Sequence, residues 1–309
     1  MAQKDVKSRI GSVKNIQKIT RAMEMVAAAR LRRAEQRIEA LRPYASAIRR
    51  MTRQAAEAAQ NVPNLPILDE HESENDVGLL LVTGDRGLAG AFNSQIVRAG
   101  VRIAAEHESE GRSVSWYASG RRGMSSIVFR GHEVAGSYTG FTDRPSYGDA
   151  RDIASDLVAA YVDGKLDRVE IVYNQYISPL SQKVTRETLL PLQQATILEG
   201  EAEGLGGRAA GEVSEDERSE TGHHALVEYE PDPEDILQRL VPAYVEISLF
   251  RALLESTASE HGARMTAMRN ASQNAGDIIK DLTLQMNRER QAEITQEILE
   301  VVSGAEGLT

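Results

Sequence analysis

Both ends of this 309-residue chain carry apolar residues spaced three and four apart, over stretches far longer than an ordinary globular helix. The N-terminal stretch runs from Val6 to Ala58, and the C-terminal stretch runs from Leu240 to Val301. This spacing is typical of α-helices that pack as coiled coils. Because each stretch has one apolar seam, each needs a partner to bury it. The sequence therefore predicts that the two ends form one long antiparallel two-helix coiled coil.

The contact seam of each helix can be predicted residue by residue. Pro43 should kink the N-terminal helix without ending it, because the apolar pattern resumes at once. The C-terminal helix is longer, so its last turns should extend beyond the N-terminal helix. The expected N-terminal seam is Val6, Ile10, Val13, Ile16, Ile19, Met23, Val26, Ala34, Ile38, Leu41, Ala45 and Ile48. The expected C-terminal seam is Leu240, Tyr244, Ile247, Leu254, Ala258, Met265, Met268, Ala275, Ile279, Leu282 and Met286, extended by Ile294, Ile298 and Val301.

The middle of the chain has a different sequence pattern, in which short apolar runs alternate with segments of helical spacing. This alternation indicates a small α/β domain of Rossmann-like type with a mostly parallel sheet, in which the last two strands are candidates for an antiparallel pair. The expected strands are 77–84, 113–120, 132–138, 167–178 and 182–192, and the expected helices are 89–107, 122–129 and 147–164. The chain is thus expected to be α+β overall.

The predicted organisation has four parts. Residues 1–60 form the N-terminal helix, residues 61–76 a linker, residues 77–230 the α/β domain, and residues 231–309 the C-terminal helix. Within the third part, residues 199–224 hold eight acidic residues and six Gly with almost no apolar side chains. Such a composition cannot bury enough surface to fold alone, so we expect a flexible loop there.

Composition excludes several kinds of chemistry. There are no cysteines, which excludes disulfides, cysteine zinc sites and thiol catalysis. No apolar run approaches the ~18–20 residues that span a bilayer. The net charge of −10 is uneven, because residues 1–53 contain 14 Lys and Arg against 4 Asp and Glu. This basic segment favours an acidic partner, and its lack of interleaved aromatic residues weakens the alternative of nucleic acid.

Motifs for catalysis or cofactor binding are weak. Residues 84–90, GDRGLAG, follow a predicted strand and precede a helix, as in phosphate-binding turns. Their glycine spacing differs from the dinucleotide fingerprint, so a tight strand-to-helix turn is the preferred interpretation. The six His are scattered; His261 lies near the coiled-coil seam, where a packed histidine is expected. No catalytic residue, metal ligand or cofactor site is predicted.

Polar residues interrupt the C-terminal seam. Such interruptions indicate a shaft that makes weak contacts with different faces of a surrounding partner. The interrupting residues are Arg251, Arg264, Asn274, Gln285, Gln291 and Thr295.

Four segments resemble the γ subunit family of F-type ATP synthases, in the same order and over nearly the whole chain. The two terminal segments are long and specific. The segments are residues 8–35 (SRIGSVKNIQKITRAMEMVAAARLRRAE), 83–93 (TGDRGLAGAFN), 230–237 (EPDPEDIL) and 259–305, which begins SEHGARMTAMRNASQNAGD.

The resemblance implies a central rotor stalk that couples proton-driven rotation of the membrane c-ring to conformational change at the β catalytic sites. The chain would be a non-catalytic subunit of the synthase, present once per complex, with the α3β3 head, the ε subunit and the c-ring as partners. ATP, ADP and Mg²⁺ would bind to the α and β subunits, and no cofactor would bind to this chain. It would lie on the cytoplasmic side of the cell membrane as a peripheral protein that reaches the membrane only through the c-ring.

The resemblance also implies roles for particular residues. Tyr229 and Glu230 match the segment that meets the c-ring, and Ile298 and Val301 would form an apolar tip. The residues that match positions facing the α3β3 head or stabilising the coupling region are Met23, Arg32, Arg33, Arg264, Gln291, Thr295 and Glu300.

Two departures from the family pattern stand out. Ala89 stands where many relatives carry Cys, and the dithiol segment of chloroplast-type relatives is absent, which excludes thiol regulation. Two rival classes remain to be compared with the rotor, namely a coiled-coil adaptor without a rotary role and a small nucleotide-binding α/β enzyme. The family motifs argue against the adaptor, and the missing phosphate-binding fingerprints argue against the enzyme.

Overall fold

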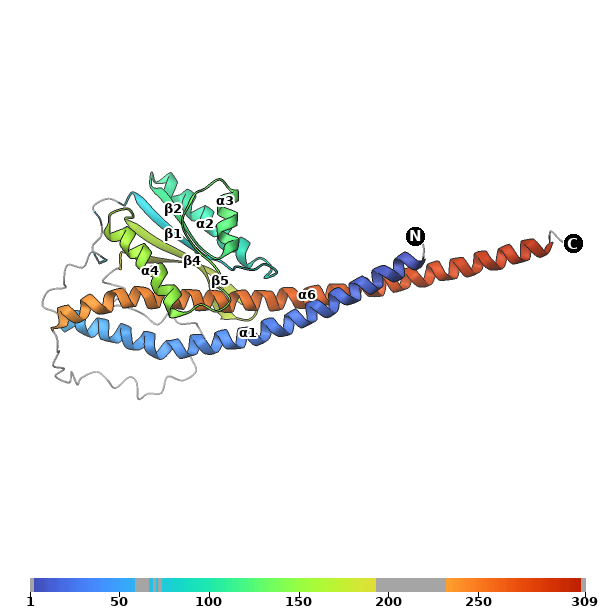
Figure 1. Cartoon of the computed structure of the whole chain (residues 1–309), viewed down its shortest axis with the longest axis horizontal. Coiled ribbons are helices and arrows are strands. Elements are labelled where there is room, and N and C mark those ends of the chain that lie inside the picture. Colours follow the sequence, from blue (N-terminus) through green and yellow to red (C-terminus); the bar gives the residue numbers. More distant parts are fainter. Residues whose placement is uncertain (1–2, 59–66, 69–70, 72–73, 193–231, 307–309) are drawn as a thin grey trace. The chain divides into compact units, whose positions relative to one another are not determined.

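The computed structural model describes residues 3–58, 67–68, 71, 74–192 and 232–306 (Figure 1). The predicted terminal helices are both present. Helix α1 spans Gln3–Ala58 and helix α6 spans Pro233–Glu306, with 56 and 74 residues. Neither helix ends at its internal proline, Pro43 in α1 and Pro242 in α6. The acidic segment 199–224 lies outside the described residues.

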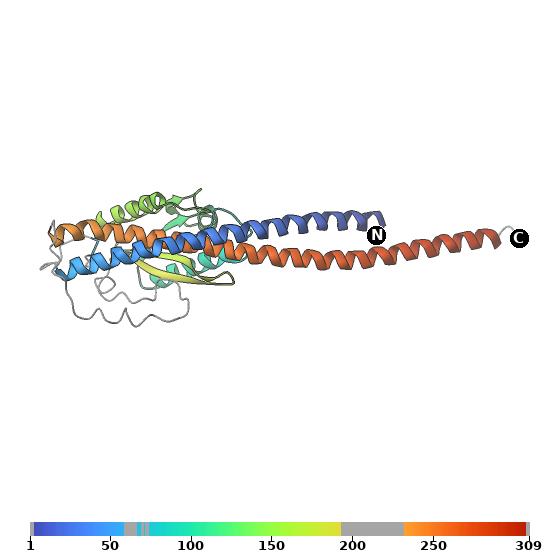
Figure 2. The same ribbon diagram turned by 90° about the horizontal axis from the view of Figure 1, so that it is seen from below.

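The chain divides into two compact units, and each long helix contributes to both. The coiled-coil unit contains Met1–Ala29 and Arg264–Thr309. The globular unit contains Arg30–Ala263. In Figures 1 and 2 the α1 and α6 segments of each unit lie side by side and run in opposite directions, so the predicted antiparallel pairing is confirmed.

The globular unit is built on a five-stranded sheet with the strand order β3-β2-β1-β4-β5. The first four strands are parallel, and β5 pairs with β4 in the antiparallel direction. This is the predicted mixed sheet. The strands are β1 (Asp76–Val82), β2 (Ser113–Ser119), β3 (Val134–Tyr138), β4 (Arg168–Ser178) and β5 (Ser181–Leu190).

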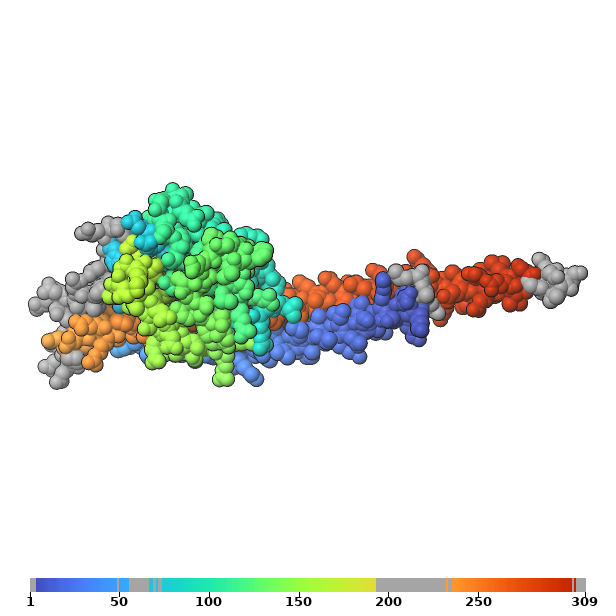
Figure 3. Space-filling view, turned by 45° about the horizontal axis from the view of Figure 1, so that its top comes forward, coloured from blue at the N-terminus to red at the C-terminus, as the bar shows by residue number. Residues whose placement is uncertain are grey.

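Alternating side chains of β1 bury both faces of this sheet. Leu79 and Leu81 point into a cluster with α2 (Phe92–Ser109) and α3 (Arg121–Phe129). Leu80 and Val82 point into the opposite cluster with α4 (Tyr147–Val162) and α6. The period-two alternation of a strand accounts for this division. In Figure 3 the green atoms of α3 and α4 form part of the outer surface of the globular unit.

One segment of α6, residues 252–262, is buried on all sides. A surface helix has one apolar stripe, whereas a helix that is enclosed must satisfy every side chain internally. Three hydroxyl groups in this segment donate to main-chain carbonyls of the globular unit: Ser256 to Val82 at 3.2 Å, Thr257 to Thr142 at 2.9 Å and Ser259 to Asn174 at 3.0 Å. These bonds attach α6 to the carboxyl end of β1, to the loop after β3 and to the middle of β4.

The contact seam of α1 in the coiled-coil unit differs from the prediction. Gln17 donates to the Ser272 carbonyl at 3.2 Å, and Glu24 pairs with Arg269 at 2.9 Å. The predicted seam was therefore wrong from Ile16 to Val26, by one residue. From Ala34 to Ile48, in the globular unit, the predicted seam residues are buried or half-buried, as expected. The observed seam residues, buried or half-buried at a regular four-three spacing, are Val6, Ile10, Val13, Gln17, Thr20, Glu24 and Ala27.

The shift has a physical reason in the facing helix. At this level α6 presents small or polar residues, among them Ser272 and Gly276, to α1. An added Cβ at Gly276 would lie 3.1 Å from the Gln17 amide nitrogen, so the two helices approach closely there. A polar, flexible Gln satisfies the Ser272 carbonyl, which an Ile side chain cannot do.

Candidate functional site

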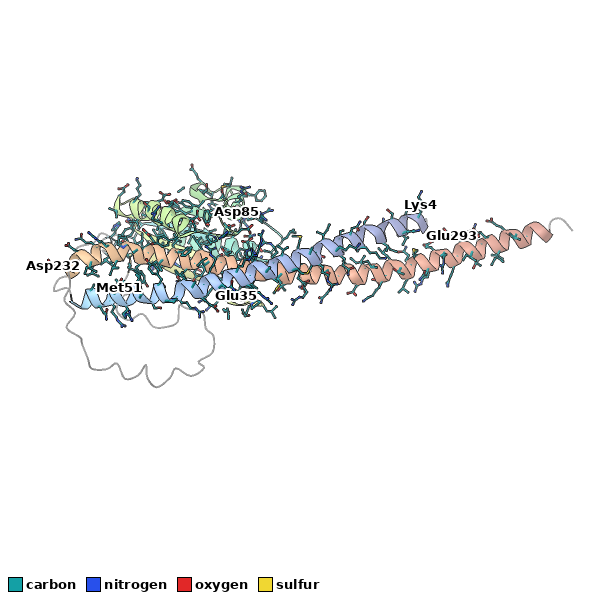
Figure 4. All side chains as sticks on the ribbon, turned by 60° about the horizontal axis from the view of Figure 1, so that its bottom comes forward. Lys4, Glu35, Met51, Asp85, Asp232 and Glu293 are labelled. Atoms are coloured by element: carbon teal, nitrogen blue, oxygen red, sulfur yellow. The ribbon has the colours of Figure 1, made fainter. Side chains whose placement is uncertain are left out.

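The turn between β1 and α2, residues 84–90, is closed by its own carboxylate. The Asp85 Oδ2 atom accepts from the backbone N–H groups of Gly140 at 2.8 Å and Thr142 at 3.3 Å, and from the Thr142 hydroxyl at 3.0 Å. Its Oδ1 atom accepts from the backbone N–H of Arg121, the first residue of α3, at 3.1 Å. Figure 4 labels Asp85 in the globular unit. Asp85 thus satisfies donors that a phosphate group would otherwise bind.

Helix α6 packs against the same turn through the side chain of Glu260. A Cβ added to Gly84 would lie 2.6 Å from the carboxyl group of Glu260, so a larger residue at this position would displace that carboxyl group. Glu260 is itself buried. In open α/β sheets, ligands bind at the carboxyl ends of strands where the strand order reverses. Here Asp85 and Glu260 fill the space beside the carboxyl end of β1, which favours the tight-turn interpretation.

The prediction that Arg251 contacts a surrounding partner was wrong, because its side chain is engaged within the globular unit. Its guanidinium donates to the Glu187 carboxylate of β5 at 2.6 Å and lies 3.7 Å from the carboxylate of Glu255. All three residues belong to the globular unit. Arg251 therefore stabilises the packing of α6 on the sheet.

Glu255 is the residue of this cluster whose charged form is destabilised by burial. Burial raises its pKa to about 7, an effect that the charge of Arg251 opposes and the charge of Glu187 reinforces. Its Oε2 atom lacks a hydrogen-bond partner among the described atoms. A buried carboxylate with an unsatisfied oxygen is costly in its charged form.

This cost makes the stability of the chain depend on pH. The folded pKa lies above the ordinary value of 4.5, so stability is highest when Glu255 is protonated and falls as pH rises from about 4.5 to about 7.5. Across that range the free energy of unfolding of the wild type should fall by up to about 3 kcal/mol, and Glu255→Gln should remove this fall. Urea unfolding of the wild type and of the variant at pH 5 and pH 8 measures the difference. Parallel pH profiles for the variant and the wild type would contradict the assignment.

The outward face of α1 in the coiled-coil unit carries an apolar stripe, which we call the outer stripe: Ile16, Ile19, Met23 and Val26. Ile16 is 53 % exposed and Ile19 is 58 % exposed. These residues have the spacing expected for a contact seam, yet α6 does not cover them. The neighbouring residues Lys14, Lys18 and Arg21 are exposed as well. A contiguous apolar face flanked by positive charge is typical of a surface that binds a partner.

The end of α6 is exposed in the same unit. Figures 1 and 2 show this helix extending past the start of α1, as predicted, and Figure 4 labels Lys4 on α1 and Glu293 on α6. All the residues from 291 to 300 are exposed, including Gln291, Thr295 and Glu300. The apolar tip residues Ile298 and Val301 are exposed too. Isoleucine and valine side chains without intramolecular cover favour burial against another chain.

The remaining predicted contact residues are distributed over both units. Arg32 and Arg33 are exposed on α1 in the globular unit, whereas Met23 is half-buried in the outer stripe. Arg264 is only 8 % exposed, which favours a role in stabilising the chain over direct contact with a partner. His261 is buried, as expected for a packed histidine. Tyr229 and Glu230 lie outside the described residues.

The polar seam positions Gln17, Thr20 and Glu24 were missed in the sequence analysis. The available signal was the unbroken four-three spacing that connects Val13 to Ala27 through them. No helix that the structure describes is long and apolar enough to cross a bilayer. Within the described ranges there is also no group of three or more His, Asp or Glu side chains placed to hold a metal ion.

Comparisons with known proteins identify the family. A family model described as ATP synthase matches residues 2–308. The chain is 42% identical to the ATP synthase gamma chain of Rubrobacter xylanophilus, over 99% of this chain and 98% of the relative. It is 40% identical to that of Nostoc sp., over 99% of both chains.

Solved structures show the same fold. A chain from the central stalk and c-ring of the Tetrahymena thermophila mitochondrial ATP synthase matches with a TM-score of 0.58 and 26% identity, over 82% of this chain and 99% of that one. A chain of the Euglena gracilis mitochondrial ATP synthase matches with a TM-score of 0.64 and 16% identity, over 99% and 94%. From the family match and the curated relatives together, the protein described here is a member of the ATP synthase gamma chain family.

Proposed function

We propose that this chain is the central rotor stalk of an F-type ATP synthase, and that it couples proton-driven rotation of a membrane c-ring to conformational change at the β catalytic sites. Family membership over the full length supports this role. So does the match to a chain described as central stalk and c-ring. The α3β3 head, the ε subunit and the c-ring are its proposed partners, with one copy of the chain per complex.

The outer stripe and the exposed end of α6 support a mechanism by contact. The stripe covers one face of α1 only, so a surrounding ring of subunits would meet different surfaces at different rotational positions. A subunit that contacts an apolar face is stabilised in a different conformation from one that contacts a basic or polar face. Such differential contact is what shifts a conformational equilibrium. The asymmetry of the stalk is therefore the proposed means of coupling.

We further propose that the chain takes no part in bond making or breaking. The strongest candidate for a phosphate site, residues 84–90, is occupied by the Asp85 and Glu260 carboxylates, which would repel a phosphate group. ATP, ADP and Mg²⁺ would then bind to the α and β subunits. Of the residues proposed to contact the head, Gln291, Thr295 and Glu300 have the exposure that this role requires, as do Arg32 and Arg33.

The proposed location is the cytoplasmic side of the cell membrane, where the chain would be peripheral and held through the c-ring. The segment with Tyr229 and Glu230 is the proposed contact with that ring. This location follows from the proposed assembly.

The observation that carries the proposal is the exposed outer stripe on a chain whose relatives are gamma chains. Assembly tests it directly. We expect the full chain, co-expressed with the α and β subunits of its organism, to co-purify in a complex of three α, three β and one copy of this chain, measured by native mass spectrometry. Recovery of α and β without this chain would contradict the proposal.

The apolar tip gives a further prediction. Ile298→Asp and Val301→Asp place a carboxylate on side chains that are exposed in the isolated chain. If the tip enters an apolar sleeve, each variant should assemble about three- to tenfold less well, because burying a charge is costly. Yield of the co-purified complex measures this. Ser303→Asp, at another exposed position of the last turns, is the matched control. Wild-type yields from both tip variants would exclude an apolar sleeve.

A further inference from the structure

A cavity of about 450 Å³ lies in the globular unit between α1, α6 and the start of α4. Its wall on α1 consists of Arg37, Ala40, Leu41 and Tyr44. These four positions follow the spacing i, i+3, i+4 and i+7, so they form one continuous face of the helix. The volume falls within the range of roughly 300–1,000 Å³ that is typical of small-molecule sites.

The opposite wall of this cavity is aromatic and held in place. The rings of Tyr147 on α4 and Phe250 on α6 meet edge to face, with centroids 5.8 Å apart and planes at 90°. The Tyr147 hydroxyl donates to the Glu246 carboxylate at 2.5 Å. The Glu246 carboxylate lines a second cavity, so its negative charge is not part of the wall described here. The aromatic wall is therefore fixed before any ligand arrives, which reduces the entropic cost of binding.

The charge at the rim is positive. The Arg37 guanidinium donates to the carbonyl of Pro145, and no carboxylate of the described structure pairs with it. Burial lowers the pKa of Arg37, and the neighbouring charge of Arg144 lowers it further. A guanidinium group that lines an apolar cavity and has no carboxylate partner would gain from an anion bound beside it.

We propose that this cavity binds a small anionic amphiphile, a molecule with one carboxylate, sulfonate or phosphate group on an aromatic or aliphatic body. The body would fill the space between Tyr44, Tyr147 and Phe250, and the anionic group would pair with Arg37. A neutral apolar ligand would leave the Arg37 guanidinium without an anionic partner. A free inorganic anion would leave the aromatic wall uncovered. This inference does not depend on the proposed rotor function.

The probe for the test is 8-anilinonaphthalene-1-sulfonate, an aromatic sulfonate whose fluorescence rises when it is buried. It is titrated into the full-length chain. We expect one saturable component with a dissociation constant on the order of 10 μM, as typical for a ligand of this size. Decanoate should displace the dye from this component, and the neutral decanol should do so at least about tenfold less effectively.

Three variants decide whether the signal comes from this cavity. Ala40→Phe places a ring in the cavity from an exposed helix position, and should abolish the saturable component. Arg37→Gln should weaken it about tenfold, because a charge-assisted pair is lost. Ala29→Phe adds the same ring at another exposed position of α1 and should leave the saturable component unchanged.

Circular dichroism and thermal unfolding of Ala40→Phe and Ala29→Phe confirm that both variants are folded. The exposed outer stripe can also bind the dye, but that contribution is common to the wild type and Ala40→Phe. Absence of a saturable component in the wild type would overturn the proposal. So would saturable binding that survives in Ala40→Phe, or that has wild-type strength in Arg37→Gln.

Discussion

The double substitution Ile16→Asp/Ile19→Asp should reduce ATP-driven proton pumping by at least about tenfold while leaving the isolated chain as stable as the wild type. Both side chains are more than half exposed in the outer stripe, so the new carboxylates remain hydrated in the free chain. In the assembled complex they would be buried against a partner, where an unpaired charge costs several kcal/mol. Fluorescence quenching of a pH-sensitive dye in membrane vesicles measures the pumping.

Two controls separate contact from stability. Lys18→Asp changes the charge beside the stripe without altering its apolar residues, and should reduce pumping less than the double variant. Ala27→Asp puts a carboxylate into the buried seam between α1 and α6, and should lower the free energy of unfolding by roughly 3 kcal/mol. If the double variant pumps protons like the wild type, the outer stripe is not a coupling surface.

Asp85→Ala should lower the free energy of unfolding by roughly 2–3 kcal/mol. The substitution removes an acceptor from four hydrogen bonds that join the end of β1 to the start of α3 and to residues 140–142. It leaves the backbone N–H groups of Arg121, Gly140 and Thr142 without that acceptor. Water can replace the carboxylate at the exposed Arg121 and Gly140, whereas the buried Thr142 loses its partner without such compensation. Urea unfolding measures the loss.

A matched variant and a rescue experiment test this explanation. Asp152 is exposed on α4, and Asp152→Ala should change stability by less than about 0.5 kcal/mol. Formate is small enough to occupy the place of the lost carboxylate, so it should restore part of the stability of Asp85→Ala and none to the wild type. If Asp85→Ala is as stable as Asp152→Ala, the carboxylate does not organise the turn.

The elements of this fold could be predicted from sequence because each one carries a strong local signal. The strand 76–82 is a short apolar run followed by Gly84. Helix α4 is capped by Ser146, whose side chain accepts from the backbone N–H of Asp149 in a capping box. The antiparallel direction of β5 follows from the short connection after Ser178, since parallel strands need a longer crossover.

The contact seam could not be predicted correctly from apolar residues alone. Ile16, Ile19, Met23 and Val26 have the spacing of a seam, but so do Gln17, Thr20, Glu24 and Ala27 one residue later. The choice between the two sets depends on what α6 presents at that level, and Ser272 and Arg269 select the polar set. The apolar set is therefore left largely exposed on α1, where it forms the outer stripe.

Arg251 was difficult to interpret for the opposite reason. Its charge suggested a surface that faces a partner, yet α6 is enclosed at this level and Arg251 pairs with Glu187, 64 residues away. Likewise, Asp85 meets Gly140 and Thr142 through contacts 55 and 57 residues apart in sequence. Pairings at such separation depend on the register of the sheet and on the placement of the loops, and no local pattern reveals them.

The most direct test of the rotor role is to observe rotation. The chain has no cysteine, so Phe129→Cys, at a position that is 90 % exposed in the globular unit, provides a single attachment point for a probe. With an α3β3 complex fixed to a surface, we predict that ATP drives rotation of the probe in one direction, with pauses that correspond to the three β sites. ATP hydrolysis by the assembled complex with a probe that does not rotate would contradict it.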